Sequence, residues 1–172
     1  MDLEKAIRTR RTHKAFGPRE VDPRTLEELV ELARWAPNHH LTNPWRFRAL
    51  GPGTRARLME LAEAEQPGAA LKLQRAPTLL LLSVIQTGDE VQDREDLLSG
   101  AVAAYIVLLA AHARGLAGYW RTLGLLDDPR ARALLDLGAE EAPVGLLYLG
   151  DPVQEQRVPG RAPPAEILSR LD

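Results

Sequence analysis

One segment, residues 96–114, restricts the possible folds of this chain more than any other. It is apolar nearly all round between Ala101 and Ala111, and a helix without a polar face has to be covered on all sides. The apolar run is about half as long as the ~20 residues that cross a bilayer, and Gly115 supplies a helix stop signal. The sequence therefore predicts a buried central helix with the other elements packed around it.

The rest of the chain alternates between amphipathic helices and apolar strands. The nearly continuous apolar run at 78–85 is typical of a strand covered on both faces, and Asp22-Pro23 marks a helix start. No repeat and no second domain is visible, so we expect a single domain, 1–172, that ends in a proline- and charge-rich extension, 150–172. The expected helices are 3–9, 23–36, 54–65, 69–75, 96–114, 127–137 and 165–171, the expected strands are 45–50, 78–85, 116–122 and 142–150, and 86–95 is expected to form a polar loop.

Composition excludes several classes of function. A net charge of −2 at pH 7 gives no reason to expect nucleic acid or an anionic membrane as a partner. The absence of cysteine excludes disulfides, thiolate chemistry and iron–sulfur clusters. The acidic start, Met1-Asp2-Leu3-Glu4, lacks the pattern of a signal peptide, so we expect a soluble, cytoplasmic protein.

The segment 36–47 is the strongest candidate for a binding loop, because it is both polar and stiff. Pro37 and Pro44 fix two backbone angles and favour extended geometry in the residues before them. We interpret the loop as a cradle for a flat, polar, heteroaromatic cofactor, namely FMN. Adjacent histidines without a third ligand at the usual spacing do not indicate a metal site. His39 is instead expected to bind phosphate or flavin, whereas a solvent-facing position stays open for His40.

Arg10, Arg11 and Thr12 follow the first helix and offer groups that bind phosphate. Guanidinium groups and a hydroxyl form charge-assisted hydrogen bonds of ~1.5–3 kcal/mol each. Lys14 adds a positive charge close by, where it could stabilise a reduced, anionic flavin ring. The alternatives are a solvated basic turn and a surface lysine, since arginine is frequent throughout the chain.

Two tryptophans lie beside predicted polar loops. Trp35 ends a predicted helix, and Trp120 belongs to the segment 118–122, Gly-Tyr-Trp-Arg-Thr. This segment could lie along one edge of a bound ring through its backbone amides and Arg121. The alternative is a strand end with a buried tryptophan, because such side chains more often pack in a core than against a cofactor.

The chain itself offers few candidate catalytic residues. It has no hydrolase nucleophile elbow and no glycine-rich dinucleotide fingerprint, since Gly51-Pro52-Gly53 lacks the later glycine. Without a nucleophile, a metal or an acid–base pair, demanding chemistry would have to come from a cofactor.

Four motifs in consistent order resemble the FMN-dependent nitroreductase family, most closely its short members of the YdjA type. Arg10-Arg11-Thr12 is similar to the Arg-Arg-Ser that binds the FMN phosphate and ribityl region in that family. The segment 36–47 is similar to Ala-Pro-Ser-x-x-Asn-x-Gln-Pro-Trp-x-Phe, 118–122 to Gly-Ile-Trp-Arg-Ser, and 147–152 to the last core strand of the short members. The resemblance covers nearly the whole chain.

The resemblance implies an α+β, nitroreductase-like fold with a mixed central sheet and helices on both faces. It also implies an obligate homodimer with FMN at an interface built from both subunits. The carboxyl-terminal extension agrees with this: its apolar end (Ile167, Leu168, Leu171) has no local core, so we expect it to wrap the partner subunit. The alternative for the extension is a loose terminus. The residues implied to bind the cofactor are Arg10, Arg11, Thr12, Lys14, Trp35, Pro37, Asn38, His39, Asn43, Gly118, Trp120, Arg121, Thr122 and Arg161.

The chain departs from the family pattern at several positions. Leu41 stands where larger relatives have Asn, and Asn43 stands where they have Gln and is one methylene shorter. Thr12 replaces Ser but keeps the hydroxyl. The chain also lacks the helical insertion that covers the site in larger relatives, so we expect an open pocket and broad specificity.

The implied reaction is ping-pong hydride transfer. NAD(P)H would deliver a hydride to flavin N5 and leave, and a small electron acceptor such as a nitroarene or quinone would take its place. No side chain need act as a catalytic acid, because water could supply the protons. Two alternatives stay open: a flavin store or sensor without turnover, and a family sideline such as flavin destruction or reductive dehalogenation.

Overall fold

The computed structural model describes residues 1–171 and is built on a four-stranded sheet. The strands β1 (Trp45–Ala49), β2 (Thr78–Ile85), β3 (Ala117–Arg121) and β4 (Glu141–Gly150) lie in the order β1-β2-β4-β3. Neighbouring strands are antiparallel, and the parallel pairing in the described chain is an isolated bridge between Thr12 and Gly118. The segment after the first helix therefore runs along the β3 edge of the sheet.

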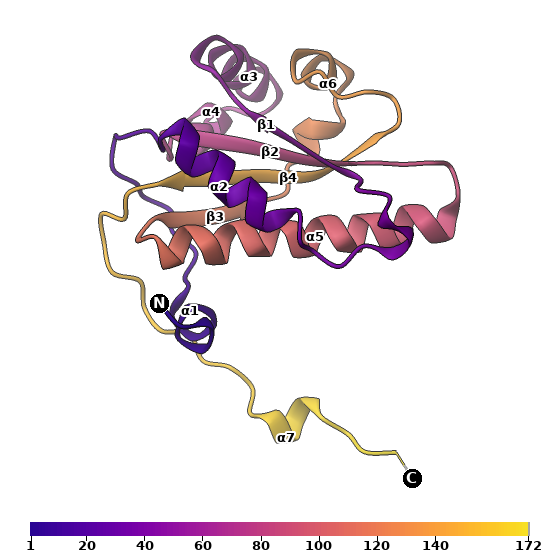
Figure 1. Cartoon of the computed structure of the whole chain (residues 1–172). Helices are drawn as coiled ribbons and strands as arrows, with labels where there is room; N and C mark the ends of the chain where they lie inside the picture. Colours follow the sequence, from indigo (N-terminus) through magenta and orange to yellow (C-terminus); the bar gives the residue numbers. More distant parts are fainter. Residues whose placement is uncertain (172) are drawn as a thin grey trace.

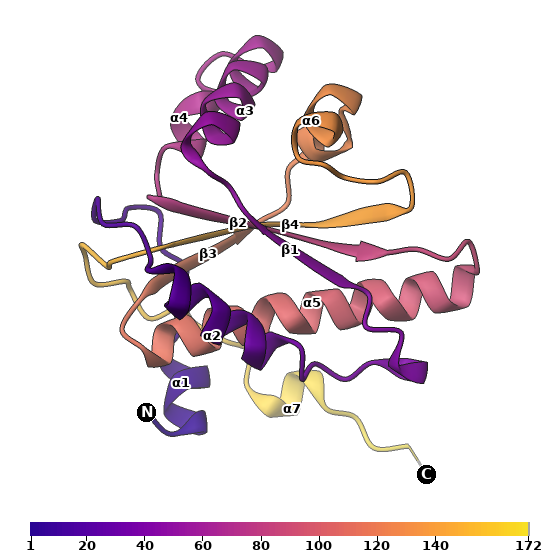
Figure 2. The ribbon, with the colours of Figure 1, turned by 45° about the horizontal axis from the view of Figure 1, so that its top comes forward.

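Helices cover both faces of the sheet (Figures 1 and 2). One face carries α2 (Pro23–Ala33) and α5 (Glu90–Ala113), and the other carries α3 (Pro52–Glu65), α4 (Ala69–Leu73) and α6 (Pro129–Leu134). Leu80 and Leu82 of β2 pack towards α2 and α5, whereas Leu79 and Leu81 pack towards the opposite layer. Because successive side chains of a strand point to opposite faces, the continuous apolar run at 78–85 serves two cores at once, as the sequence predicts.

Helix α5 is the longest element, but it differs from the prediction in length and burial. It begins at Glu90 rather than Asp96, because the Asp89 side chain accepts from the backbone N–H groups of Val91 and Gln92 and caps the helix. Six of the ten residues of the expected polar loop at 86–95 are therefore helical. The inner face packs closely on the sheet: a Cβ at Gly100 would lie 2.7 Å from Val84 Cγ1.

The outer face of α5 is exposed in the single chain. It presents a stripe of apolar side chains along the helix: Leu97, Leu98, Val102 and Tyr105. The nearly continuous apolar character of the sequence therefore reflects an inner face that contacts the sheet and an outer face that stays largely exposed in the single chain. By length and composition α5 is long and apolar enough to cross a membrane. One such helix is weak evidence for a membrane span, because the inner face of α5 lies in the core.

Helices α1 (Leu3–Thr9) and α7 (Pro164–Ile167) lie below the α5 layer in Figure 1. Helix α1 lies against α5, and the side chains of Thr9 and His112 share a hydrogen bond of 2.8 Å. The carboxyl-terminal extension runs past α1 and continues away from the body, with α7 as its one short helix among the described residues. Asp172, the last residue of the predicted extension, lies outside the described residues.

Several helix ends were predicted too far along the chain. Helix α2 ends at Ala33 instead of 36, α4 at Leu73 instead of 75, and α6 at Leu134 instead of 137. The predicted helix 165–171 is confined to Pro164–Ile167. Helix α3, by contrast, begins earlier than predicted, because Pro52 fits the first turn of a helix.

Candidate functional site

The amino-terminal arginines lie beside β3. The backbone N–H of His13 donates to Gly118 O at 3.1 Å, which holds the segment 10–13 along the strand. The Arg10 guanidinium lies over the Tyr105 ring of α5, 5.9 Å from its centroid. Arg11 folds back, and its Nη1 donates to the carbonyl oxygens of Arg8 and Arg10 at 2.7 and 2.9 Å.

Neither arginine has an acidic partner among residues 1–171, although many other arginines of this chain do. The Nε atoms of Arg10 and Arg11 are buried and make no hydrogen bond. Buried cationic donors without a partner cost free energy unless an anion binds them. This pair is therefore suited to an anionic group, while Thr12 and Lys14 beside it are exposed.

Strand β3 points its side chains to two different faces. Trp120 packs against the α2 and α5 core, and its indole N–H donates to Val144 O at 3.1 Å. Gly118 lies where β3 approaches α5, because a Cβ there would be 2.7 Å from Leu108 Cδ2. The structure thus gives both residues a packing role, the alternative that the sequence left open for Trp120.

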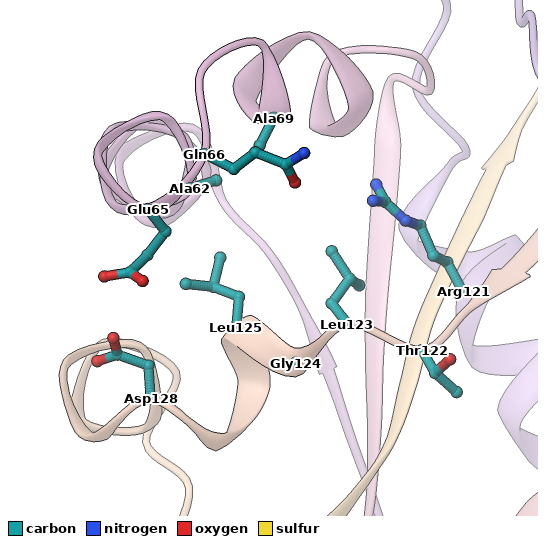
Figure 3. A pocket seen from close by; sticks show the side chains of 10 residues that line it. All are labelled: Ala62, Glu65, Gln66, Ala69, Arg121, Thr122, Leu123, Gly124, Leu125 and Asp128. Atoms are coloured by element: carbon teal, nitrogen blue, oxygen red, sulfur yellow. The ribbon is translucent and has the colours of Figure 1, made fainter.

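Arg121 and Thr122 line a cavity of about 370 Å³ on the opposite face of β3. In Figure 3 the Arg121 side chain points towards Gln66 and Ala69, and Leu123 and Leu125 project between it and Glu65. Arg121 Nη1 donates to the Tyr148 hydroxyl at 3.4 Å. Burial raises the Tyr148 pKa, and Arg121 opposes that rise. Since Tyr148 remains neutral at pH 7, Arg121 brings an unneutralised positive charge to a partly apolar cavity.

The cavity has the size of a small-molecule site, but its lining is divided about evenly between polar and apolar surface. Ligand pockets are typically 300–1,000 Å³, with mainly apolar walls and a few placed polar groups. The far rim of the cavity carries the carboxylates of Glu65 and Asp128, and Arg130 forms an ion pair with each of them. Its lining residues are Ala62, Glu65, Gln66, Ala69, Arg121, Thr122, Leu123, Gly124, Leu125 and Asp128.

The predicted binding loop lies at the amino-terminal end of α5. Within it, His39–Leu41 forms a 3₁₀ turn, η1, in which the His39 and His40 rings stack at 3.9 Å. His39 Nδ1 lies 2.9 Å from Glu95 Oε2. The Asn38 amide and the Thr42 hydroxyl both donate to Asp96 Oδ1, at 3.0 and 2.7 Å.

One chain does not bring all the predicted site residues together. The loop is anchored at Asp96, Arg10 lies over Tyr105, and α1 meets His112; at the α-helical rise these points are about 14 and 24 Å along α5 from Asp96. Trp35 is 73% exposed at the end of α2, and Pro37 is exposed beside it. Arg161 lies in the exposed extension. The predicted residues thus fall into an arginine group, 10–14, and a loop group, 35–43. The cavity at Arg121 is a third, separate place.

Sequence reasoning missed polar residues that the fold places next to these groups. His13 is buried with no hydrogen bond to its Nδ1. Burial lowers the pKa values of His13 and His112, and the charge of Arg10 lowers them further. The adjacency of His13 to the arginines was a usable signal. No group of three metal-binding side chains occurs within residues 1–171.

Comparison with known proteins identifies the family. The model of the nitroreductase family matches residues 7–151. The chain belongs to the nitroreductase family. Within this nitroreductase-like protein the α+β, nitroreductase-like fold is confirmed, with helices on both faces of the sheet. The four described strands pair antiparallel, however, and not as the mixed sheet that the resemblance implied.

Relatives of this nitroreductase family member carry different names. YdjA of Escherichia coli, a proposed NAD(P)H nitroreductase, is 26% identical over 163 residues, covering 88% of this chain and 89% of YdjA. The 5,6-dimethylbenzimidazole synthase of Rhodospirillum rubrum is 28% identical over 181 residues, covering 91% and 85% of the two chains.

Solved structures support the same fold. A nitroreductase-like family protein from Bacillus cereus superimposes with a TM-score of 0.89 at 23% identity, covering 100% of this chain and 97% of the other. A proposed nitroreductase from Desulfovibrio desulfuricans, solved in complex with FMN, superimposes with a TM-score of 0.80 at 22% identity, covering 98% and 96%.

Proposed function

We propose that this protein is an FMN-dependent NAD(P)H oxidoreductase that reduces nitroaromatic or quinone-like acceptors. Family membership supports the class of reaction. The observation that carries the proposal is the arginine pair beside β3, whose buried Nε atoms lack partners. The pair offers an anion site for the FMN phosphate, and the cavity at Arg121, on the opposite face of the sheet, is a separate, partly apolar site.

The residues present fit the cofactor in chemistry. Arg10, Arg11 and Thr12 would hold the phosphate, and Lys14 and Arg121 would place positive charge near the ring. FMN, when bound, supplies the two-electron carrier between the nicotinamide and the acceptor. The residues of this chain bind and orient the reactants, and the positive charge favours the reduced cofactor. The complete proposed set is Arg10, Arg11, Thr12, Lys14, Trp35, Pro37, Asn38, His39, Asn43, Gly118, Trp120, Arg121, Thr122 and Arg161.

We also propose that the protein acts as a homodimer with FMN at the interface. The exposed stripe on α5 supports this, because a contiguous apolar surface of this kind marks an interaction site. Leu3 and Ile7 add apolar surface on α1, and the extension exposes Ile167 and Leu168. The separation between the arginine group and the loop group also supports it: a partner subunit would bring its own loop to the first chain's arginines.

We regard 1–172 as one FMN-binding domain whose extension, 150–172, wraps the partner. A cytoplasmic location agrees with reduced nicotinamide as the electron donor.

The proposal is tested with the purified protein. We expect a yellow protein, or a colourless one that binds added FMN, and steady-state oxidation of NADH or NADPH when a nitroarene or a quinone is present. Failure to bind FMN contradicts the proposal. FMN binding without turnover on either acceptor class favours a flavin store or sensor.

A second function is favoured by one relative, the 5,6-dimethylbenzimidazole synthase. Analysis of products after reduction of the FMN-loaded protein in air separates the two. Formation of 5,6-dimethylbenzimidazole identifies the second function, and an unchanged flavin after many turnovers supports the first.

A further inference from the structure

The binding loop is held by one buried carboxylate. Asp96 lies on the first turns of α5 and is 1% exposed. A single oxygen, Oδ1, accepts hydrogen bonds from Asn38 Nδ2 at 3.0 Å and Thr42 Oγ1 at 2.7 Å. These donors stand at the two ends of the loop 38–42, so Asp96 joins both ends to the same point of the helix.

The loop needs such an anchor because its backbone is strained. His40, Leu41 and Asn43 have φ angles of 55°, 51° and 49°, in the left-handed region that residues other than glycine rarely adopt. Each such residue costs on the order of 1 kcal/mol or more, and it persists only when its surroundings enforce it. Asn38 Oδ1 also accepts from the Asn43 backbone N–H at 2.7 Å, so the Asn38 side chain carries the constraint from Asp96 to a left-handed residue.

Other contacts of the loop with α5 are weaker candidates for this role. The pair between His39 and Glu95 is largely exposed, and exposed ion pairs contribute little. Ser99, further along the same helix, is buried but makes no hydrogen bond. Asp96 is thus the buried side chain of α5 that binds the loop.

We propose that Asp96 is a positioning residue, which holds the loop 38–43 in the strained shape that FMN binding requires. This proposal rests on the proposed function, since it assigns the loop to the cofactor. Asp96 acts through Asn38 and Thr42 and does not itself touch the cofactor. Replacing the carboxylate releases the loop into unstrained backbone conformations, and the cofactor must then pay the cost of ordering it again.

The test measures FMN affinity and loop exchange in the full-length protein. Asp96→Ala should weaken FMN binding by about tenfold or more, as expected for the loss of a hydrogen bond to a charged group. In the protein freed of FMN, amide hydrogen exchange at 38–43 should become faster. Asp96→Asn keeps an oxygen at the Oδ1 position, and it should restore affinity to within about threefold.

Two further variants separate positioning from general stability. Asp93→Ala is the matched control: the Asp93 side chain, one turn earlier on α5, accepts from the Thr87 and Gly88 backbone N–H groups and not from the loop. It should lower thermal stability and leave FMN affinity unchanged. Thr42→Val removes one donor to Asp96 and should weaken FMN binding, and it replaces Asp96→Ala as the deciding variant if that protein does not fold.

The outcomes are distinguishable. Wild-type affinity in Asp96→Ala, or in Thr42→Val when only that variant folds, overturns the positioning role. Equal loss of affinity in Asp96→Ala and Asp93→Ala also overturns it, because both variants would then act through the stability of α5. If the wild-type protein binds no FMN, the proposed function fails and this inference fails with it; faster exchange at 38–43 in Asp96→Ala would then show that the carboxylate still fixes the loop.

Discussion

The least exposed ion pair among residues 1–171 joins Arg48 of β1 to Glu141 of β4. Burial alone would raise the Glu141 pKa, but hydrogen bonds from Arg48, Ser83 and Gly138 outweigh it and lower that pKa to about 2. A carboxylate whose folded-state pKa lies below its ordinary value stabilises the fold above the ordinary value. This stabilisation is lost as the pH falls from about 4.5 to about 2.

We expect Glu141→Gln to lower the free energy of unfolding at pH 7 by on the order of 3 kcal/mol. The difference from wild type should shrink steadily as the pH falls below about 4.5, and denaturant titrations at pH 7 and pH 3 measure it. Glu4→Gln is the control, because Glu4 pairs with Arg8 on an exposed helix surface and should change stability by less than about 0.5 kcal/mol. Equal deficits for Glu141→Gln at both pH values would contradict the assignment.

The arginines give a second prediction for single side chains. Arg10→Ala should weaken FMN binding by about tenfold to a hundredfold, because it removes a charge-assisted contact to phosphate. Arg19→Ala is the matched control, since Arg19 is already paired with Asp151 through two hydrogen bonds. Titration of FMN fluorescence measures both variants. Similar losses in both would show that general positive charge, not Arg10 itself, attracts the cofactor.

For individual residues, the sequence indicated candidate side chains better than it indicated where those side chains point. It indicated Arg10 and Arg11 together, but Arg10 reaches Tyr105 whereas Arg11 bends back to its own backbone. Nothing in the sequence distinguishes these outcomes, because the direction of a long side chain depends on neighbours from distant segments. Asp96 escaped notice for the same reason: its partners in the loop are more than fifty positions away.

Among the elements, β4 depends on a glycine at its contact with β3. Gly145 has a φ of +143°, and a Cβ there would lie 2.7 Å from both Arg121 O and Trp120 Nε1. The register between β2 and β4 shifts next to this residue, between Leu82 and Ser83. A side chain at 145 would therefore meet backbone that cannot move without breaking the pairing of β3 and β4.

We expect Gly145→Ala to destabilise the protein by about 2 kcal/mol or more. It should also alter tryptophan fluorescence, because the added methyl displaces the Trp120 indole from its hydrogen bond with Val144. Gly53→Ala is the control: it lies in α3 with nothing within 4 Å of the added Cβ, and it should be neutral or stabilising. Thermal unfolding with fluorescence detection compares the two. An unchanged melting temperature in Gly145→Ala would show that β4 relaxes around the methyl.

The strands were predicted almost to the residue, and the helices less well. Strand β2 lies between Pro77 and the polar pair Gln86-Thr87, so its apolar run marks it clearly. Helix α5 was predicted to begin at Asp96, but Asp89 is also an acceptable cap, and the structure uses Asp89 for the cap and Asp96 for the loop. Sequence alone cannot decide between two caps when the difference depends on a segment that packs later.

For the whole molecule, the exposed stripe on α5 leads to a prediction about assembly. Leu98, 59% exposed at the centre of that stripe, should become buried in the proposed homodimer. Leu98→Asp should therefore shift the protein from dimer to monomer, measured by analytical ultracentrifugation, and should reduce FMN affinity in parallel. Leu71→Asp is the matched control, since Leu71 is 67% exposed on α4, on the opposite face of the sheet.

Two results would contradict the dimer. A wild-type protein that sediments as a monomer at micromolar concentration would exclude it directly. Dissociation by Leu71→Asp but not by Leu98→Asp would place the interface on the other face. An extension without its own core leads the sequence to predict a partner, and this stays a prediction. The sequence could not predict how the proposed site would divide between chains, because the proposed division rests on distances along α5 that only the folded chain defines.

The outer edge of the sheet has a consequence of its own. Among the described strands β1 pairs only with β2, and a sheet edge of this kind is a template on which further strands can add. Arg46 is the second residue of this short edge strand, and its Nη1 donates to the carbonyl oxygens of Asn43 and Trp45. The guanidinium thus satisfies backbone acceptors and places charge where a foreign strand would dock. The fold carries its own protection against aggregation at the end of the sheet nearest the loop.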